Sequence, residues 1–448
     1  MPVSSVRRFV AWLSGMASQR SFLTSVGAVS VIRLTGGALL FLSQLLLARW
    51  MGTSAFGVYS YAWAWVAVLG PLAGLGFAGT SVRFLASYRV QGTQSQIRGL
   101  LGFGRVLTLA SSLIVAACGL LVVHIVARNS PYASALQAAF LAIPLLAFVS
   151  LDAANARGFN WMALSAVAEQ IGRPAALIVF GWLFMKLSTD ASARGYVLCC
   201  VLAYFSAALV QHLVVRRKIY AVVSSGPSDV ETAVWLRVSA GMLLLNGAEM
   251  IRLNTDLVLV GSLLGPVDVG VYTAVVRTAT LVSFVLNITG MVAQTNLAGL
   301  HAQKRRAELI RFVASTTRSI FLTTLIIGAA LALCGQLVLG RFGPGFVAGY
   351  PALLILIGGH ILVAGFGPLT SLLLMTGHQM PAATIYGISA TTSAVLNFLL
   401  IPPLGIAGAA IASSLNLLLT QIALAVVVRR RLGIPFAAFG FRPLNSHP

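Results

Sequence analysis

Arginine side chains lie inside several long apolar stretches of this sequence. Arg33 is near the middle of the run 22–48, and Arg252 and Arg277 lie within later runs. A guanidinium at the bilayer centre costs roughly 3 kcal/mol even on the most lenient insertion scale, so it usually faces protein or water. Guanidinium groups bind phosphate through paired hydrogen bonds. Several of them in one membrane protein therefore indicate a path for an anionic cargo.

The apolar run 234–264 carries the densest polar pattern. Asn246, Glu249, Arg252 and Asp256 follow one another at spacings of three, three and four residues, so they form a stripe along one helix face. Two interpretations stay open. Either both acids neutralise the arginine and lock the helix, or the stripe lines a cavity in which the cation binds cargo and an acid exchanges an ion.

The other intramembrane charges extend this pattern. Glu169 and Arg173 are four residues apart, so they form either a helical ion pair or further cargo and ion sites. Asp152 is another candidate acid, or it pairs with Arg157. The six cations and four acids of the spans disfavour a pathway for cations. The candidate substrate-binding residues are Arg33, Arg173, Asn246, Arg252 and Arg277, and the candidate ion-coupling residues are Asp152, Glu169, Glu249 and Asp256.

The elements that position these residues are membrane helices. The chain has 448 residues, of which 58% are hydrophobic and 9% charged, with a mean hydropathy of +0.93. A helix needs about 20 apolar residues to cross the hydrocarbon. Twelve segments qualify: 22–48, 58–80, 101–126, 133–155, 161–187, 195–216, 234–264, 270–298, 312–338, 350–376, 382–402 and 404–428. We therefore expect an all-α integral membrane protein.

The net charge of +21 is explained by topology rather than by nucleic acid. Basic residues in short loops favour the cytoplasmic side. Nineteen of the thirty cations fall on one side under a cytoplasmic N-terminus, and five on the other. Both termini are therefore expected in the cytoplasm, where the basic loops attract anionic phospholipids. A stripe of apolar residues predicts an interfacial helix at the N-terminus: Phe9, Trp12, Leu13 and Met16.

The chain also contains a duplication. The segment Gly52–Tyr59 matches Gly265–Tyr272 at an offset of 213 residues, and Arg128 and Pro131 meet Arg341 and Pro344 at the same offset. Two halves of six spans share one orientation, which predicts a parallel pseudo-twofold repeat along the membrane normal. The expected parts are an N-terminal lobe at 1–216, a cytoplasmic linker at 217–233 and a C-terminal lobe at 234–448.

Three segments resemble the multidrug/oligosaccharidyl-lipid/polysaccharide (MOP) exporter superfamily. They are Leu46–Tyr59, Asn254–Tyr272 and Asn397–Ala410. The sequence is most similar to the polysaccharide-transporter branch, the Wzx-type flippases. The lipid II flippase branch usually has fourteen spans, and the drug-antiporter branch commonly relies on acids in its lobes, whereas the first span here has Arg33 and no acid.

The resemblance implies two six-helix lobes in a V and alternating access for a polyprenyl-pyrophosphate-linked oligosaccharide. The expected protein is a flippase of the bacterial inner membrane, coupled to protons or sodium ions, that serves O-antigen, capsule or exopolysaccharide synthesis beside a glycan polymerase. A drug/cation antiporter of the same fold is the alternative, followed by a glycan polymerase or ligase. The sequence has no Walker loop, no His-Glu-x-x-His motif and no metal-type cysteine spacing. No enzyme activity, metal or cofactor is therefore expected.

Overall fold

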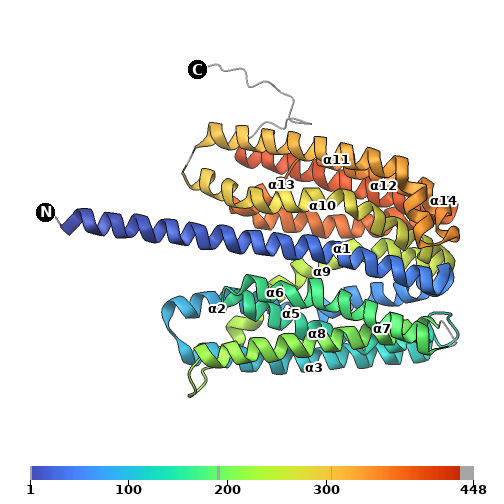
Figure 1. Ribbon diagram of the computed structural model, residues 1–448, viewed down its shortest axis with the longest axis horizontal. Coiled ribbons are helices and arrows are strands. Elements are labelled where there is room, and N and C mark those ends of the chain that lie inside the picture. Colours follow the sequence, from blue (N-terminus) through green and yellow to red (C-terminus); the bar gives the residue numbers. More distant parts are fainter. Residues whose placement is uncertain (1–2, 189–191, 304, 434–448) are drawn as a thin grey trace.

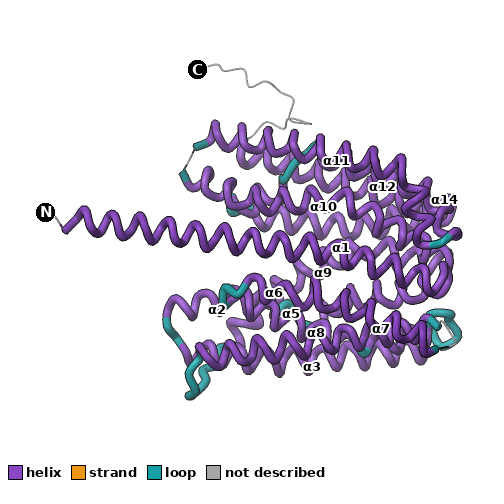
Figure 2. The backbone as a smooth tube through the Cα atoms, viewed as in Figure 1, coloured by secondary structure: helices purple, strands orange, loops and turns teal. Residues whose placement is uncertain are grey.

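The computed structural model describes residues 3–188, 192–303 and 305–433. Within these ranges the backbone forms helices joined by short turns, and no strand occurs among the described residues (Figure 2). Long helices lie side by side along a common direction and form an elongated bundle (Figure 1). The predicted all-α membrane fold is confirmed.

The helices of the first half of the chain form the N lobe. They are α1 (Val3–Ala73), α2 (Phe77–Gln91), α3 (Gln94–Val126), α4 (Ala133–Phe140), α5 (Ala142–Gly158), α6 (Met162–Val167), the π-helical turn η1 (Ala168–Gly172), α7 (Arg173–Leu187) and α8 (Ala193–Val222).

The helices of the second half form the C lobe. They are α9 (Thr232–Leu263), α10 (Pro266–Ala302), α11 (Arg306–Phe342), the 3₁₀ turn η2 (Pro344–Gly349), α12 (Tyr350–Ala364), α13 (Leu369–Met375) and α14 (Gln379–Leu432).

Two of the helices are folded back on themselves. The two arms of α1 meet at Gly52, where φ is 75°, and the chain turns back there at the right of Figure 1. The arms of α14 meet at Gly405, where φ is 58°. Both values lie in the left-handed region that glycine adopts without steric penalty. Ser389 and Asn416, one on each arm of α14, are hydrogen-bonded, which confirms the reversal.

Twelve spanning segments follow from this layout. Eight stretches of the described residues are long and apolar enough to cross a membrane, and two of these contain the reversals. Helices α9 and α10 add two more, with 32 and 37 residues. The twelve segments divide into two lobes of six, as the sequence predicts.

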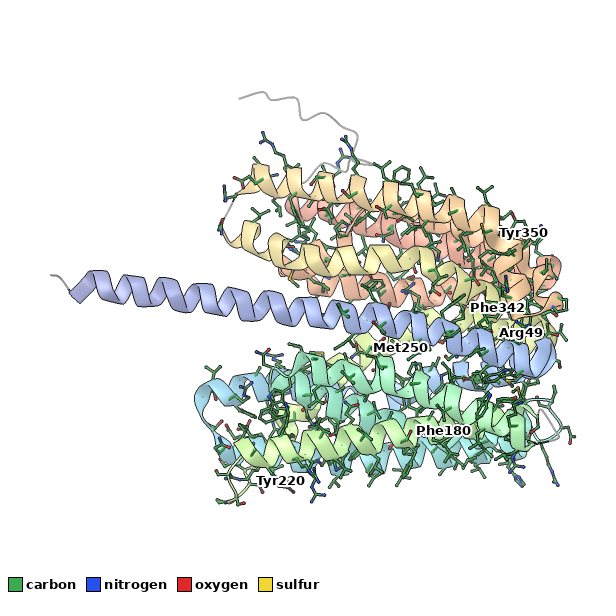
Figure 3. All side chains as sticks on the ribbon, in the orientation of Figure 1. Arg49, Phe180, Tyr220, Met250, Phe342 and Tyr350 are labelled. Atoms are coloured by element: carbon green, nitrogen blue, oxygen red, sulfur yellow. The ribbon has the colours of Figure 1, made fainter. Side chains whose placement is uncertain are left out.

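The two ends of the bundle are packed differently. At the end that carries the turn at Gly52, one hydrophobic core joins both lobes and includes Phe56, Tyr272 and Phe342. We call this the sealed end. At the opposite end, which carries the linker, the N lobe and the C lobe have separate cores. Arg49 and Phe342 lie toward the sealed end and Tyr220 toward the linker end (Figure 3). The helices of both lobes therefore share a large hydrophobic core at the sealed end only, and at the linker end the lobes meet through α9.

The duplicated motif itself forms the contact at the sealed end. Gly57 of α1 and Gly270 of α10 occupy equivalent positions, because they are 213 residues apart. A Cβ atom at Gly57 would collide with the carbonyl oxygen of Pro266, and one at Gly270 with that of Thr53. The backbones of the two lobes approach this closely only because both residues lack a side chain.

The linker is shorter than the predicted 217–233, because α8 continues to Val222 and α9 begins at Thr232. The start of α9 packs against the N lobe. Trp235 is fully buried in the N-lobe core at the linker end and donates to the Tyr88 hydroxyl at 3.0 Å. Helix α9 therefore bridges the lobes, since its later turns pack against α14 of the C lobe.

The N-terminal segment continues into the first span. The backbone is helical from Val3, and this helix extends beyond the bundle (Figure 1). The interfacial helix stays a prediction. The side chains of residues 1–30, including the apolar stripe, lie outside the described residues.

Candidate functional site

Each lobe contains a polar contact of a tyrosine hydroxyl at an equivalent place in the repeat. In the N lobe the Tyr59 hydroxyl lies 3.6 Å from Cys200 Sγ. In the C lobe the Tyr272 hydroxyl lies 3.4 Å from Ser413 Oγ. Both pairs are 141 residues apart, and corresponding members differ by the offset of 213. The duplication therefore extends to side-chain contacts inside the lobes.

The C-lobe pair holds a carboxylate. Asp256 Oδ2 accepts hydrogen bonds from the Tyr272 hydroxyl at 2.9 Å and from Ser413 Oγ at 3.2 Å. Its Oδ1 accepts from the backbone N–H of Leu257 at 2.8 Å. A carboxylate with several donors is stable inside a protein without an ion-pair partner. Asp256 therefore does not pair with Arg252. The interpretation in which both acids neutralise this arginine is wrong for Asp256.

The corresponding region of the N lobe holds a guanidinium. Arg173, the first residue of α7, donates from Nη1 to the Tyr204 hydroxyl at 2.6 Å. Its guanidinium carbon lies 5.0 Å from the centre of the same ring, within the range of a cation–π contact. No ion pair between Arg173 and Glu169 forms among the residues that the structure describes. The charge of Arg173 is therefore not neutralised by a paired carboxylate.

Arg277 of α10 brings a second guanidinium to the same neighbourhood. The charged groups near enough to act on it include Arg173 and Asp256, and the hydroxyls of Tyr59 and Tyr204 lie in the same neighbourhood. Its Nε is buried and has no hydrogen-bond partner within the described part of the chain. The Nε of Arg173 is in the same state. Two buried guanidinium Nε donors, one from each lobe, thus have no hydrogen-bond partner among the described residues. We call Arg173, Tyr204, Asp256, Tyr272 and Arg277 the central cluster.

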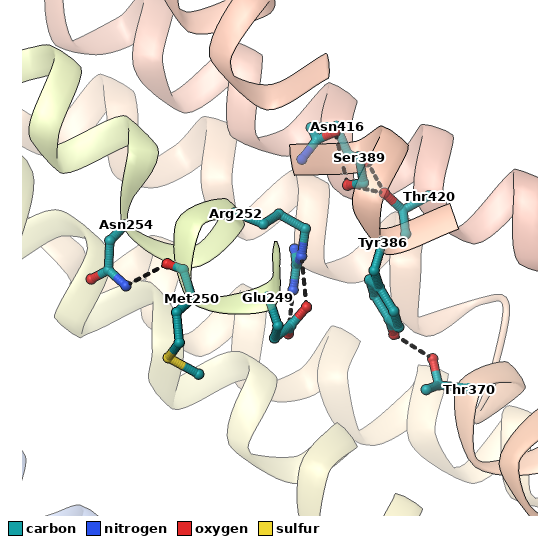
Figure 4. Close-up of polar contacts among 9 residues, drawn as sticks. All are labelled: Glu249, Met250, Arg252, Asn254, Thr370, Tyr386, Ser389, Asn416 and Thr420. Atoms are coloured by element: carbon teal, nitrogen blue, oxygen red, sulfur yellow. Dashed lines mark hydrogen bonds and ion pairs between the residues drawn. The ribbon is translucent and has the colours of Figure 1, made fainter. Parts of the chain in front are cut away.

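Arg252 is neutralised within its own helix. Its Nε and Nη2 donate to the two carboxylate oxygens of Glu249 at 3.1 and 2.8 Å (Figure 4). The guanidinium carbon lies 5.5 Å from the centre of the Tyr386 ring, whose hydroxyl is 2.7 Å from Thr370 Oγ1. A bidentate pair stacked on an aromatic ring is a rigid arrangement. The charge of Arg252 is therefore balanced by Glu249, whereas Arg173 and Arg277 have no paired carboxylate among the described residues.

The remaining predicted residues are more exposed. Arg33 and Asn246 are 213 residues apart, so they are equivalent in the repeat, and both side chains are exposed. The charge of Arg33 acts on Arg157. Glu169, in the π-helical turn η1, is also exposed, and its charge acts on Arg157 and Arg173.

Asp152 belongs to a different group inside the N lobe. Its side chain is 2% exposed, and Oδ2 lies 2.8 Å from Nδ1 of His212 on α8. The predicted alternative, a pair with Arg157, does not form among the described residues. Asp152 therefore lies outside the central cluster, whose acid is Asp256.

A family model identifies the chain at this point. The model described as polysaccharide biosynthesis protein matches residues 22–294, which is more than half of the sequence. The chain belongs to the polysaccharide biosynthesis protein family. No curated protein sequence matches it significantly.

Solved structures show that this family member has the fold of the MOP superfamily. An inward-facing multidrug resistance MATE transporter superposes with a TM-score of 0.75 at 13% identity, covering 90% of this chain and 98% of its own. The lipid II flippase MurJ in an inward closed conformation gives 0.70 at 13% identity, covering 90% and 87%. A MOP transporter from Pyrococcus furiosus gives 0.64 at 13% identity, covering 91% and 95%. The protein therefore has the fold of these MOP-superfamily transporters.

Sequence reasoning missed five residues that shape these sites. Tyr272 lies in the duplicated motif, but the motif indicated only the repeat and no polar contact. The pair Cys200 and Ser413 was detectable through the offset of 213, although nothing in either local sequence marks it. Tyr204 and His212 gave no signal, because an aromatic or histidine residue in an apolar helix usually belongs to the core.

Proposed function

We propose that the protein is a flippase that moves a polyprenyl-pyrophosphate-linked oligosaccharide across the bacterial inner membrane by ion-coupled alternating access. Its products would serve O-antigen, capsule or exopolysaccharide synthesis. The family supports a role in polysaccharide formation, and the MOP fold supports transport rather than catalysis. In this proposal both termini and the linker end face the cytoplasm, in keeping with the distribution of basic residues.

One observation carries the proposal. Arg173 of the N lobe and Arg277 of the C lobe lie in one electrostatic neighbourhood, and each keeps a buried Nε without a partner among the described residues. Two guanidinium groups match the two phosphates of a pyrophosphate, because each binds phosphate oxygens in a forked geometry. A ligand that contacts both groups also bridges the two lobes, so its binding is linked to their relative position.

The asymmetric packing supports alternating access. The lobes share a core at the sealed end and have separate cores at the linker end. Cargo therefore reaches the central cluster from the linker end in this conformation. Release on the other side requires the contact between Gly57 and Gly270 to open. The ion that drives the cycle binds at one of the predicted acids, of which Asp256 lies in the neighbourhood of Arg277 and Glu169 in that of Arg173.

The test uses purified protein in proteoliposomes and a fluorescent short-chain polyprenyl-pyrophosphate disaccharide. Accessibility of the sugar to an added membrane-impermeant enzyme reports its movement between leaflets. We expect Arg173→Gln and Arg277→Gln each to slow this movement about tenfold to a hundredfold, the equivalent of a lost hydrogen bond to a charged group. The lysine variants should retain part of the rate, because charge remains while the forked geometry is lost.

Arg305→Gln is the matched control. Arg305 is exposed, and its partner is Glu308 one turn away. Surface ion pairs of this kind contribute little to stability or function, so this variant should move the probe at the wild-type rate. Wild-type protein that leaves the probe in place, or Arg173 and Arg277 variants that move it normally, would contradict the proposal. Movement of cationic dyes instead would favour a drug/cation antiporter.

A further inference from the structure

Tyrosine side chains of the N lobe bind the end of α9 at the sealed end. The hydroxyl of Tyr132, in the turn before α4, donates to the backbone carbonyl of Gly261 at 3.0 Å. The hydroxyl of Tyr61, on the second arm of α1, lies 3.2 Å from the hydroxyl of Ser262. The two tyrosine rings are 4.1 Å apart. We call these four residues the tyrosine interface.

Phenylalanine side chains join the lobes at a second place of the sealed end. The ring of Phe41 on α1 lies 5.7 Å from that of Phe342 at the end of α11 (Figure 3). The ring of Phe56 lies 6.0 Å from that of Phe346 in η2. Apart from Phe41, these side chains are at most 1% exposed. We call these four residues the phenylalanine interface.

The two interfaces correspond in the repeat but differ in chemistry. In both, the turn before the fourth span of one lobe contacts the other lobe. At the offset of 213, the equivalents of the two tyrosines are Ala274 and Gly345. The equivalents of the two C-lobe phenylalanines are Asn129 and Ala133. One interface is therefore hydrogen-bonded and the other is formed by hydrocarbon.

The tyrosine interface resists entry of a lipid chain. Gly261 is among the last four residues of α9, whose carbonyl oxygens have no partner within the helix. The Tyr132 hydroxyl supplies this partner. A hydrocarbon chain has no donor that could replace the hydroxyl, and an unpaired backbone carbonyl in hydrocarbon is strongly unfavourable.

The phenylalanine interface offers no such resistance. A phenylalanine side chain has no hydrogen-bonding group, so a hydrocarbon chain can replace these contacts without leaving a polar atom unpaired. Apolar side chains are also exposed nearby on the helices that meet there. Leu42 on α1 is 45% exposed, and Leu337 on α11 is 65% exposed. The interface is thus flanked by apolar surface on both lobes.

We propose that the polyprenyl chain of the cargo passes between the lobes at the phenylalanine interface, while the tyrosine interface stays closed and acts as the pivot of opening. The inference rests on the proposed flippase function and assigns the path of the lipid part of the substrate. The head group lies between the lobes and the chain lies in the bilayer, so the lobes must part on one side when the head group leaves through the sealed end.

The test compares the two interfaces with one cross-linking reagent. The two exposed cysteines are first replaced by alanine. One double variant combines Phe41→Cys with Phe342→Cys, and the other combines Tyr61→Cys with Ser262→Cys. Both are treated in proteoliposomes with a short, reducible bis-methanethiosulfonate reagent. We expect the cross-link at the phenylalanine interface to stop movement of the fluorescent polyprenyl-pyrophosphate disaccharide, and the cross-link at the tyrosine interface to leave most of it.

The single-cysteine variants are the controls, and the reagent should not change their rates. Reduction of the reagent should restore movement in the phenylalanine pair. Loss of movement in both pairs, loss in the tyrosine pair alone, or movement in the cross-linked phenylalanine pair would overturn the assigned path and leave the flippase intact. Wild-type protein that does not move the probe at all would overturn the flippase.

A second measurement needs no substitution. A polyprenyl-pyrophosphate disaccharide with a diazirine in its chain is illuminated while the wild-type protein moves it, and labelled peptides are identified by mass spectrometry. Peptides that contain Phe41 or Phe342 should carry more label than peptides that contain Tyr61 or Tyr132. Equal or greater label at the tyrosines would refute the path, even where a cysteine variant does not fold.

Discussion

Equivalent tyrosine contacts in the two lobes lie beside opposite charges. In each, a tyrosine hydroxyl from the duplicated motif contacts a small polar side chain 141 residues further on. In the C lobe both side chains of this contact donate hydrogen bonds to the carboxylate of Asp256. In the N lobe the equivalent position is Ser43, which is fully buried, and the nearby charge is the guanidinium of Arg173. The duplication therefore keeps these side chains at equivalent positions, while single substitutions determine whether the buried charge of each lobe is positive or negative.

A second pair of equivalent positions also carries different residues in the two lobes. Arg173 and Tyr386 are equivalent in the repeat, because they are 213 residues apart. In the N lobe the guanidinium at this position stacks on Tyr204, and in the C lobe the ring at this position receives Arg252. Each of these two contacts thus pairs a guanidinium with a tyrosine ring, but of the two arginines only Arg252 has a carboxylate partner among the described residues. In the proposed function the N-lobe cation is the one that binds an anion, because the C-lobe cation already has a carboxylate partner.

The largest effect should come from giving the N lobe the acid of the C lobe. In Ser43→Asp the repeat places a carboxylate beside Tyr59 and Cys200, and the charge of Arg173 acts on both residues. The new acid should neutralise Arg173 and slow movement of the polyprenyl-pyrophosphate probe about a hundredfold, the upper range for a lost charged hydrogen bond.

Ser43→Asn separates charge from size, because the amide has the shape of the carboxylate without its charge. We expect the asparagine variant to move the probe within about threefold of the wild type, since no cation is neutralised. Both variants should elute as folded protein. Equal losses in the two variants would show that crowding at this buried position, and not charge, distinguishes the lobes.

The next largest effect is expected at the sealed end, where the two halves of the repeat are in contact. Gly57→Ala adds a Cβ atom against the carbonyl oxygen of Pro266, a backbone atom that cannot move aside. Overpacking of this kind is unfavourable by about 1–3 kcal/mol, and ~2 kcal/mol would reduce the sealed population about thirtyfold. Distances between spin labels on the two lobes at the sealed end should lengthen.

Gly102→Ala is the matched control, because a Cβ atom there meets nothing within 4 Å. Alanine in a helix is favoured over glycine by up to about 1 kcal/mol. The label distances of this variant should equal those of the wild type. Unchanged distances in Gly57→Ala would mean that the lobes do not depend on this contact.

Much of this arrangement was predictable from the sequence. Apolar length and spacing predict twelve spans, and the match of Gly52–Tyr59 with Gly265–Tyr272 predicts two equivalent halves. The same match marks the residues that meet at the sealed end. These features depend on local sequence and on a fixed offset, so no knowledge of packing is needed.

The partners of the charged side chains were not predictable in the same way. The stripe on α9 suggested that Glu249 and Asp256 serve Arg252 together, but Asp256 instead binds Tyr272 and Ser413. Position on one helix face shows which side chains share a direction and says nothing of what faces them from other helices. His212 lies 60 residues from Asp152, so only the packing of α8 on α5 reveals that pair.

A smaller effect should distinguish the two tyrosines that stack under arginines. The Tyr204 hydroxyl accepts from a charged guanidinium, whereas the Tyr386 hydroxyl bonds the neutral Thr370. Loss of a hydrogen bond to a charged group is unfavourable by about 1.5–3 kcal/mol, and of a neutral one by about 0.5–1.5. Tyr204→Phe should therefore lower the thermal unfolding midpoint more than Tyr386→Phe. Both substitutions keep the ring, so equal shifts would contradict the assignment of Arg173 to Tyr204.

The smallest effect comes from exchanging the two groups that the tyrosines contact. Cys200→Ser gives the N lobe the hydroxyl of the C lobe. Because sulfur is a weak acceptor, and Tyr59 contacts it at 3.6 Å, the unfolding free energy should change by less than about 1 kcal/mol. Ser413→Cys is the reverse exchange, and it removes a hydroxyl that donates to Asp256. A thiol is a weak donor, so this variant should lose about 1–2 kcal/mol of unfolding free energy. The asymmetry in unfolding free energy between Cys200→Ser and Ser413→Cys depends only on the carboxylate of the C lobe. It should therefore disappear when both are repeated in Asp256→Asn, and an asymmetry that persists there would place its origin elsewhere.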